Sequence, residues 1–249
     1  MMATLVDIHT HILPAVDDGA ANTEIALQMA NAFVAAGTSA LFATPHGYSP
    51  VYHVHTDVIR TETKRFNQAL KVAQIPLTVR PGMEIRYHAD VITHLLASDA
   101  LCLGAVADDK IRYALIELPT REWPKSLPDT IYKLNLRNIT SIIAHPERNL
   151  AAQKNDRIVD AALTEGALLQ VTAASVMGNF GTACERTAHR LLAAGKVHFV
   201  ASDAHDSTLR TPGLRSALDH IRTAWKLTAA ADRCIAMAEH IWDETTHDN

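Results

Sequence analysis

Two short motifs near opposite ends of the chain most constrain how it can fold. One apolar run ends in DIHTH (residues 7–11), and another ends in ASDAH (residues 201–205), about 190 residues later. Alternate residues of a strand point to the same side, so His9 and His11 should face one point, as should Asp203 and His205. Imidazole and carboxylate groups suit divalent ions such as zinc, manganese and iron. We therefore expect the first and last strands to meet around a metal site, as they would in a barrel.

The order of apolar and amphipathic segments predicts a parallel α/β fold. Strand-like runs are expected at residues 4–9, 39–44, 77–84, 113–118, 140–145, 168–172 and 197–202. Amphipathic helices are expected at residues 23–36, 56–73, 89–97, 128–136, 156–166, 184–194 and 214–227. Gly37, Gly166 and Gly195 stand where helix C-caps are expected. Alternating strands and helices favour a parallel sheet, and the 249 residues suit one closed or distorted barrel, a single domain over 1–249.

Charge and cysteine content exclude several classes of protein. The net charge is −4 with no block of Lys and Arg, so we expect no nucleic-acid partner. Cys102, Cys184 and Cys234 are widely spaced without a CxxC motif, which indicates neither a disulfide framework nor a zinc–thiolate site. No segment resembles a secretory signal or reaches the roughly 18 apolar residues of a membrane span. We expect a cytoplasmic protein without membrane insertion.

Candidate ligands gather where the predicted strands end, which is where barrel enzymes carry reactive residues. These positions hold His9 with His11, His46, Glu84, Glu117, His145 with Arg148, Thr172 with Ser175, and Asp203 with His205. Glu84 and Glu117 stand in apolar surroundings, and no Lys or Arg lies at a predictable place beside both. Because a buried unpaired carboxylate is costly, a cation is needed there. The pattern predicts one polynuclear metal centre.

Three features of the sequence allow more than one interpretation. The sequence Asp17-Asp18-Gly19 fits a simple turn, or one aspartate returns to the metals. Arg148 is either a solvated surface charge or part of the site. The histidines away from strand ends are interpreted as ordinary surface or core residues: His53, His55, His88, His94, His189, His198, His220, His240 and His247. His53 and His55 are the least secure of these, because their loop borders the expected site.

Taken together, eight segments resemble the PHP (polymerase and histidinol phosphatase) superfamily. They are DIHTH (7–11), VDDG (16–19), TPH (44–46), GMEI (82–85), RYALIE (112–117), IAHPER (143–148), TAASVMGNFG (172–181) and FVASDAH (199–205). They follow the family's order from residue 5 to about residue 215. Within the superfamily they are most similar to bacterial protein-tyrosine phosphatases of capsule and exopolysaccharide loci.

The resemblance implies a distorted (β/α)7 TIM-like barrel with two to three divalent metal ions, manganese foremost and Mg²⁺, Fe²⁺ or Zn²⁺ as alternatives. One ion would have the ligands His9, His11, Glu84 and Asp203. A second would have Glu84, Glu117 and His145, and a third Asp18, His46 and His205. Arg148 and Arg210 stand where the family places phosphate-binding arginines. A metal-bound hydroxide would attack phosphorus, without a cysteinyl-phosphate intermediate.

The resemblance implies a phosphotyrosine phosphatase acting on the tyrosine-rich tail of a kinase that controls capsular or exopolysaccharide synthesis. A small-molecule phosphoesterase, such as a histidinol-phosphate phosphatase, is an alternative. A non-catalytic PHP scaffold that binds metal is another. The loop at residues 47–55 bears on the choice, because it lacks the basic residues that relatives often carry there. The physiological substrate, the identity of the metals and the oligomeric state stay open.

Overall fold

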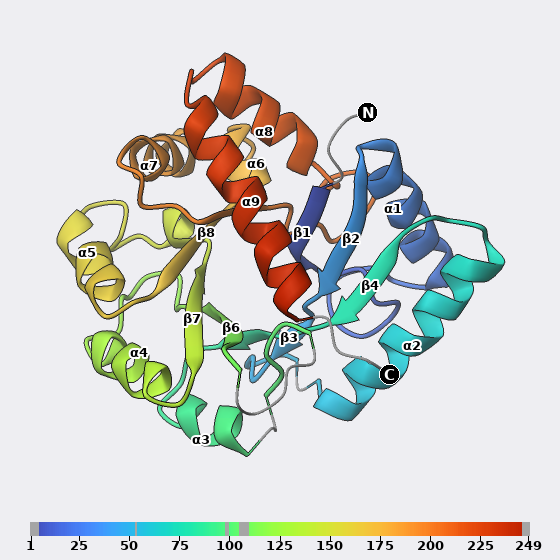
Figure 1. Cartoon of the computed structure of the whole chain (residues 1–249), viewed down its shortest axis with the longest axis horizontal. Helices are drawn as coiled ribbons and strands as arrows, with labels where there is room; N and C mark the ends of the chain where they lie inside the picture. The colour runs from blue at the N-terminus through green and yellow to red at the C-terminus, as the bar shows by residue number, and fades with distance from the viewer. Residues whose placement is uncertain (1–4, 53, 98–99, 105–109, 246–249) are drawn as a thin grey trace.

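The computed structural model shows strands alternating with helices along the chain (Figure 1). It describes residues 5–52, 54–97, 100–104 and 110–245. The strands are β1 (Leu5–Thr10), β2 (Thr38–Ala43), β3 (His46–Gly47), β4 (Thr78–Pro81), β5 (Glu84–Arg86), β6 (Arg112–Glu117), β7 (Ile139–Ala144), β8 (Leu168–Thr172) and β9 (Phe199–Ala201). The helices are α1 (Thr23–Ala35), α2 (Thr56–Val72), α3 (Val91–Leu96), α4 (Leu127–Asn135), the 3-10 turn η1 (Pro146–Arg148), α5 (Asp156–Thr164), α6 (Ala173–Val176), α7 (Thr182–Ala193), α8 (Leu214–Thr223) and α9 (Thr228–Glu244).

Every strand pairing among the described residues is parallel, which confirms the predicted α/β class. One sheet has the order β1-β2-β4 and the other the order β3-β5-β6-β7-β8-β9. The two sheets are connected where Thr44-Pro45 separates β2 from β3 and Gly82-Met83 separates β4 from β5. The predicted strand at 77–84 is therefore two short strands. Proline has no N–H to donate to a ladder, which accounts for the break after β2.

The first strand lies beside the segment that follows the last one, as the end motifs predict. Thr10 and Ala204 form a parallel bridge. The N–H of Asp203 donates to the carbonyl of His9, and the N–H of His11 donates to the carbonyl of Ala204, both at 2.9 Å. The buried carboxylate of Asp7 adds a contact by accepting the N–H of Ser202 at 3.1 Å. This seam brings the two end motifs to one place.

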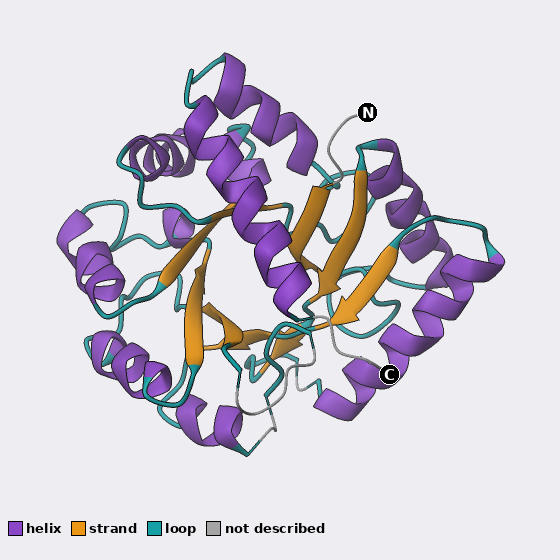
Figure 2. Ribbon diagram, viewed as in Figure 1, coloured by secondary structure: helices purple, strands orange, loops and turns teal. Residues whose placement is uncertain are grey.

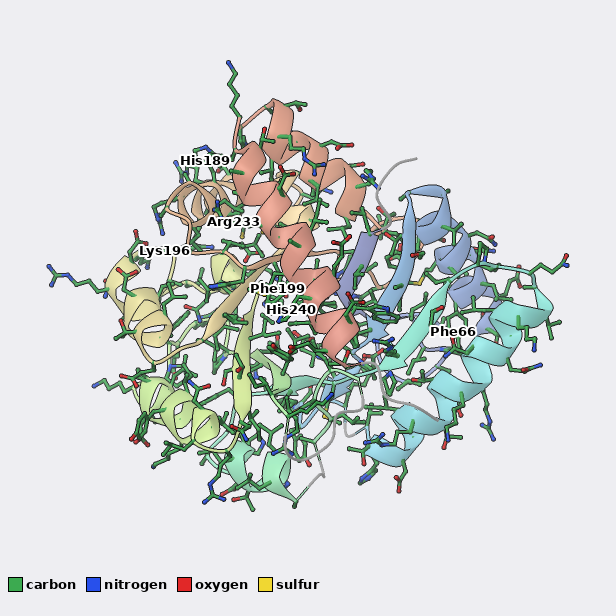
Figure 3. All side chains as sticks on the ribbon, viewed as in Figure 1. Phe66, His189, Lys196, Phe199, Arg233 and His240 are labelled. Carbon is green, nitrogen blue, oxygen red and sulfur yellow. The ribbon has the colours of Figure 1, made fainter. Side chains whose placement is uncertain are left out.

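Apolar side chains form two clusters on opposite faces of the strands. Figure 2 shows the helices arranged around these strands. The larger cluster fills the space between strands and surrounding helices, and Phe66 of α2 belongs to it. The smaller one joins inward-facing residues of several strands, such as Ile8, Phe42 and Phe199, to Ile241 of α9. Helix α9 crosses the end of the strands that faces the viewer, and Figure 3 labels Phe199 beside it.

Helix α9 is the main element that the sequence analysis missed. The predicted helix at 214–227 ends at Thr223, and a separate helix begins at Thr228. The buried stripe of α9 consists largely of small residues, such as Ala231, Cys234 and Ala238, which give weak hydrophobic contrast. The short elements β3, η1 and α6 were not predicted either, and the remaining elements match the predictions to within a few residues at their ends. Gly37, Gly166 and Gly195 have positive φ, as expected of helix C-terminal glycines.

Some predictions lie partly outside the described residues, namely the first residue of the strand expected at 4–9, His53 and His247. Within the described ranges, no helix is both long and apolar enough to cross a bilayer.

We predict that shortening Ile241 destabilises the fold. Ile241 is fully buried against the inner cluster, so Ile241→Ala should lower the free energy of unfolding by about 2–5 kcal/mol in urea denaturation. Leu136→Ala, at a position 64 % exposed, is the matched control and should change it by less than about 0.5 kcal/mol. Equal changes in the free energy of unfolding for the two variants would show that packing of Ile241 on α9 against the inner cluster does not stabilise the fold.

Candidate metal centre

The side chains of His9 and His11 converge on one point at the end of β1. Their Nε2 atoms lie 3.3 Å apart. Glu84 Oε2 lies 3.4 Å from both nitrogens. Asp203 Oδ1 lies 3.4 Å from the Nε2 of His9 and 3.5 Å from that of His11. All four side chains are buried.

The other ring nitrogens of these two histidines are bound to acceptors. His9 Nδ1 lies 2.9 Å from Gln170 Oε1, and His11 Nδ1 lies 2.6 Å from Asp17 Oδ2. Because an amide oxygen and a carboxylate only accept, each Nδ1 carries the proton in the neutral imidazole and each Nε2 presents a lone pair. Two lone pairs and two carboxylate oxygens then surround one point. Such a donor set fits a divalent cation.

A second group of candidate ligands lies beside the first. His46 Nε2 is 3.5 Å from Asp18 Oδ1, and His205 Nε2 is 3.4 Å from the same oxygen. The rings of His11 and His205 have centroids 3.8 Å apart, which joins this group to the first. Asp18 is more exposed than the other members, with a relative side-chain exposure of 39 %.

Glu84 connects these residues to the remaining candidates. Its Oε1 lies 2.8 Å from His145 Nε2, and its Oε2 lies 3.0 Å from His46 Nδ1. Glu117, on the neighbouring strand, lies within 4.8 Å of His46 and Glu84 by their ligand atoms. Its Oε2 also forms an ion pair with Arg86 Nη1 at 3.0 Å. The β5–β6 register puts Arg86 opposite Glu117, so Glu117 has a cationic partner that the sequence analysis did not identify.

The structure brings all the predicted ligands together, but their grouping differs in detail from that implied by the resemblance. Ligand atoms within 4.8 Å of one another define three groups: His9, His11 and Glu84; His11, Asp18, His46 and His205; and His46, Glu84 and Glu117. His46 therefore reaches two groups, one through each ring nitrogen. His145 is not a member of these three groups, but its Nε2 contacts Glu84 Oε1.

Arg148 and Arg210 meet at Asp203. Arg148 Nη1 and Arg210 Nη2 donate to the same oxygen, Asp203 Oδ2, at 2.8 and 2.7 Å. Oδ1 of this carboxylate is the oxygen that faces His9 and His11. The two guanidinium groups are partly exposed, at 30 % and 29 %, so Arg148 is not a fully solvated surface charge.

Charge interactions hold the carboxylates in the ionised form. Burial opposes ionisation of Asp203, but attraction to His9, a hydrogen bond with His11 and the charge of Arg210 hold its pKa well below the usual range. Burial likewise opposes ionisation of Glu84, yet four surrounding histidines keep its pKa well below the usual value. Burial and the charge of His11 lower the pKa of His205 to about 4, so this imidazole is neutral at neutral pH and can bind a cation.

Sequence reasoning missed the residues that orient the ligands. Asp17 forms the turn that the sequence allows, because its Oδ1 accepts the N–H of Gly19, and its Oδ2 accepts from His11 and from the N–H of His46. Asp18 is the aspartate of this segment that lies among the candidate ligands. Gln170 is a polar residue within the buried strand β8. A buried amide needs a partner, which was an available signal.

The loop at residues 47–55 presents aromatic rings. The ring of Tyr52 stacks on His46, with centroids 5.9 Å apart. The ring of Tyr48 packs against His88 and His94 at 5.1 and 4.3 Å. These two histidines thus support the loop, in keeping with their interpretation as structural residues.

Comparison with known proteins identifies the family. The family model described as capsular polysaccharide synthesis, CpsB/CapC, matches residues 5–241. The chain therefore belongs to the CpsB/CapC family. It is 36 % identical over 214 residues to tyrosine-protein phosphatase YwqE of Bacillus subtilis, covering 86 % of this chain and 82 % of that protein. It is 30 % identical over 206 residues to putative tyrosine-protein phosphatase CapC of Staphylococcus aureus, covering 83 % and 79 %.

Solved structures agree with this membership of the CpsB/CapC family. A structure from work on YwqE of Bacillus subtilis and CpsB of Streptococcus pneumoniae, described as metal-dependent tyrosine phosphatases, superimposes with a TM-score of 0.89 at 33 % identity, covering 98 % of this chain and 96 % of that one. The phosphotriesterase homology protein of Escherichia coli shares the fold, with a TM-score of 0.57 at 12 % identity and coverage of 98 % and 99 %.

We predict that Asp17→Asn weakens metal binding without unfolding the protein. Asparagine keeps one acceptor oxygen where Asp17 uses two, so His11 loses its fixed orientation. Loss of such an orienting contact typically costs about 10- to 100-fold in metal affinity, which Mn²⁺ titration calorimetry would measure. Asp219→Asn, in an exposed pair on α8, is the control. Equal Mn²⁺ affinities of the two variants would show that His11 is oriented by other contacts.

Proposed function

We propose that this chain is a metal-dependent protein-tyrosine phosphatase of capsular or exopolysaccharide synthesis. One observation carries the proposal: Asp203 joins a cluster of cation ligands to two arginines that can bind an anion. A phosphomonoester needs both, because cations at the reacting centre and donors on the phosphoryl oxygens are complementary requirements. The names and metal dependence of the relatives support the same activity.

The metal ligands in this proposal are His9, His11, Asp18, His46, Glu84, Glu117, His145, Asp203 and His205. They fit two to three divalent ions, with Mn²⁺ as our first choice and Mg²⁺, Fe²⁺ or Zn²⁺ as alternatives. When bound, such ions lower the pKa of a coordinated water, orient the ester and neutralise negative charge. Four carboxylates among the ligands offset only part of the charge of three divalent ions, which leaves the site attractive to a phosphate dianion.

Arg148 and Arg210 hold the phosphoryl group in this proposal. Two guanidinium groups share a single carboxylate, so the three side chains carry net positive charge. Each guanidinium keeps N–H groups beyond the one that Asp203 uses, and paired N–H groups match the spacing of phosphoryl oxygens. The arginines therefore orient the phosphate and stabilise the charge that redistributes in the transition state.

The cysteines do not serve as nucleophiles in this proposal. Burial raises the pKa of Cys102 and of Cys234 to about 12, and burial also raises the pKa of Cys184. Because the thiolate is the reactive form, thiols with such pKa values are poor nucleophiles at neutral pH.

The remaining features of the proposal concern the fold and the substrate. We infer that the two parallel sheets belong to one distorted (β/α)7 barrel in a single domain over residues 1–249, supported by the seam between β1 and the segment after β9.

The substrate is a phosphotyrosine protein, in our proposal the tyrosine-rich tail of a bacterial kinase, and the reaction takes place in the cytoplasm. A small-molecule phosphoesterase is the second candidate, because the loop at 47–55 offers rings and no Lys or Arg.

We predict that the Mn²⁺-loaded protein hydrolyses a phosphotyrosine peptide faster than a phosphoserine peptide or histidinol phosphate. Excess EDTA should abolish the activity and added Mn²⁺ should restore it, because the ligand cluster depends on cations. Phosphate release is the measurement. Faster hydrolysis of histidinol phosphate would favour the small-molecule enzyme, and metal binding without any hydrolysis would favour a scaffold. Full activity in EDTA would contradict the metal centre.

We predict that Arg148→Ala and Arg210→Ala each lower kcat/KM by about 10²–10³-fold, as loss of one electrostatic donor to a transition state does. Metal content should not change, because the arginines bind Asp203 Oδ2 and the ligands face Oδ1. Lysine variants should recover only part of the activity, since lysine lacks the fork. Arg222→Ala, in an exposed pair with Asp232, is the control. Rates of the two alanine variants within about twofold of wild type would make both arginines surface charges.

A further inference from the structure

The ring of Phe180 lies against the guanidinium group of Arg148. The Cζ atom of Arg148 is 4.7 Å from the ring centroid, and Arg148 Nη1 donates to Asp203 Oδ2 at 2.8 Å. The guanidinium carbon therefore lies over the face of the ring, and Nη1 points to the carboxylate. We propose that Phe180 is a positioning residue that fixes the plane of Arg148 for binding a phosphate group. This inference rests on the proposed function, in which Arg148 binds the phosphoryl oxygens.

The backbone around Phe180 is built to present its ring. After α6 the N–H of Gly178 donates to the carbonyl of Ser175, and the N–H of Gly181 donates to the carbonyl of Gly178. Gly178 and Gly181 have φ of 77° and 85°, a region that residues with a side chain rarely adopt. A Cβ at Gly181 would meet no atom within 4 Å, so conformation and not space requires this glycine. The segment TAASVMGNFG thus ends in a turn that carries Phe180.

A buried carboxylate ties this segment to the one that carries Arg148. Glu147 is fully buried in η1, and its Oε1 accepts the N–H of Thr172 at 3.0 Å, directly before α6. Gln153 Nε2 donates to the carbonyl of Glu147 at 2.9 Å. Since Glu147 precedes Arg148 in the chain, η1 and the segment leading to Phe180 are held together. The ring and the guanidinium group therefore keep a fixed relation.

Arg210 reaches the same carboxylate oxygen by another route. Its loop is held by the Asp206 carboxylate, which accepts the N–H groups of Thr208 and Arg210. The N–H of His205 donates to the carbonyl of Arg210 at 2.9 Å. The backbone next to Arg210 is thus fixed directly. The N–H of Arg148 likewise donates to the carbonyl of His145 at 3.0 Å. The guanidinium group of Arg148 has an aromatic face as its second contact, and a ring face attracts a guanidinium group.

The test is a double-mutant cycle on phosphate binding by the Mn²⁺-loaded protein. The Kd of inorganic phosphate is measured by calorimetry for wild type, Phe180→Leu, Phe180→Tyr, Arg148→Ala and the double variant of Phe180→Leu with Arg148→Ala. Phe180→Leu should weaken phosphate binding about 3- to 10-fold, and Phe180→Tyr, which keeps the ring face, should stay within about twofold of wild type. In the Arg148→Ala background, Phe180→Leu should have no further effect. Tyr132→Leu, at an aromatic residue 52 % exposed on α4, is the matched control.

Thermal unfolding and metal content measured on each variant separate positioning from folding. A role in packing alone would lower the Tm of Phe180→Leu and leave its phosphate affinity unchanged, which would overturn the proposal. An equal loss of affinity from Phe180→Leu with and without Arg148 would also overturn it. Coupled phosphate binding in a protein that does not hydrolyse phosphotyrosine peptide would support the role of Phe180 and reject the proposed phosphatase function.

Discussion

The carboxylate of Asp203 is the contact on which the rest of the site depends. One oxygen faces the Nε2 atoms of His9 and His11, and the other accepts from Arg148 and Arg210. A single buried group thus sets the spacing between the cation ligands and the arginines. Asp203 has φ of 52°, a conformation that costs a residue with a side chain of order 1–3 kcal/mol. The hydrogen bond from its N–H to the carbonyl of His9 keeps the backbone in that conformation.

This arrangement divides the molecule into two ends with different physical tasks. The ligand cluster concentrates carboxylates and imidazoles that are costly to bury without partners. The opposite end is closed by α9, where Ile241 and Phe199 belong to one apolar cluster. Burial of apolar side chains at that end therefore contributes to the free energy of unfolding, whereas burial of the polar ligands at the other end does not. The same division is general among βα barrels, whose reactive residues lie at the carboxyl ends of the strands.

The sequence was sufficient where a local pattern determines a direction in space. Strand periodicity predicts that His9 and His11 point the same way, and the end motifs predict the meeting of β1 with the segment around Ala204. It was not sufficient where the outcome depends on which strands pair. Arg86 lies opposite Glu117 only through the register of β5 and β6, which no local pattern contains. The segment TAASVMGNFG likewise gives no sign that Phe180 lies against Arg148, because that contact depends on the turn after α6.

The two sides of the site offer a substrate different chemistry. In the proposed function Arg148 and Arg210 bind the phosphoryl group, whereas the loop at 47–55 carries the rings of Tyr48 and Tyr52. Tyr48 has φ of 59°, and its ring packs on His88 and His94, so the loop is held by contacts between rings. Aromatic surface contributes to binding through apolar burial and depends little on the charge of the peptide. In the proposed function the arginines match the phosphate charge, so basic residues in this loop are not required for anion recognition, and their absence is compatible with a phosphopeptide substrate.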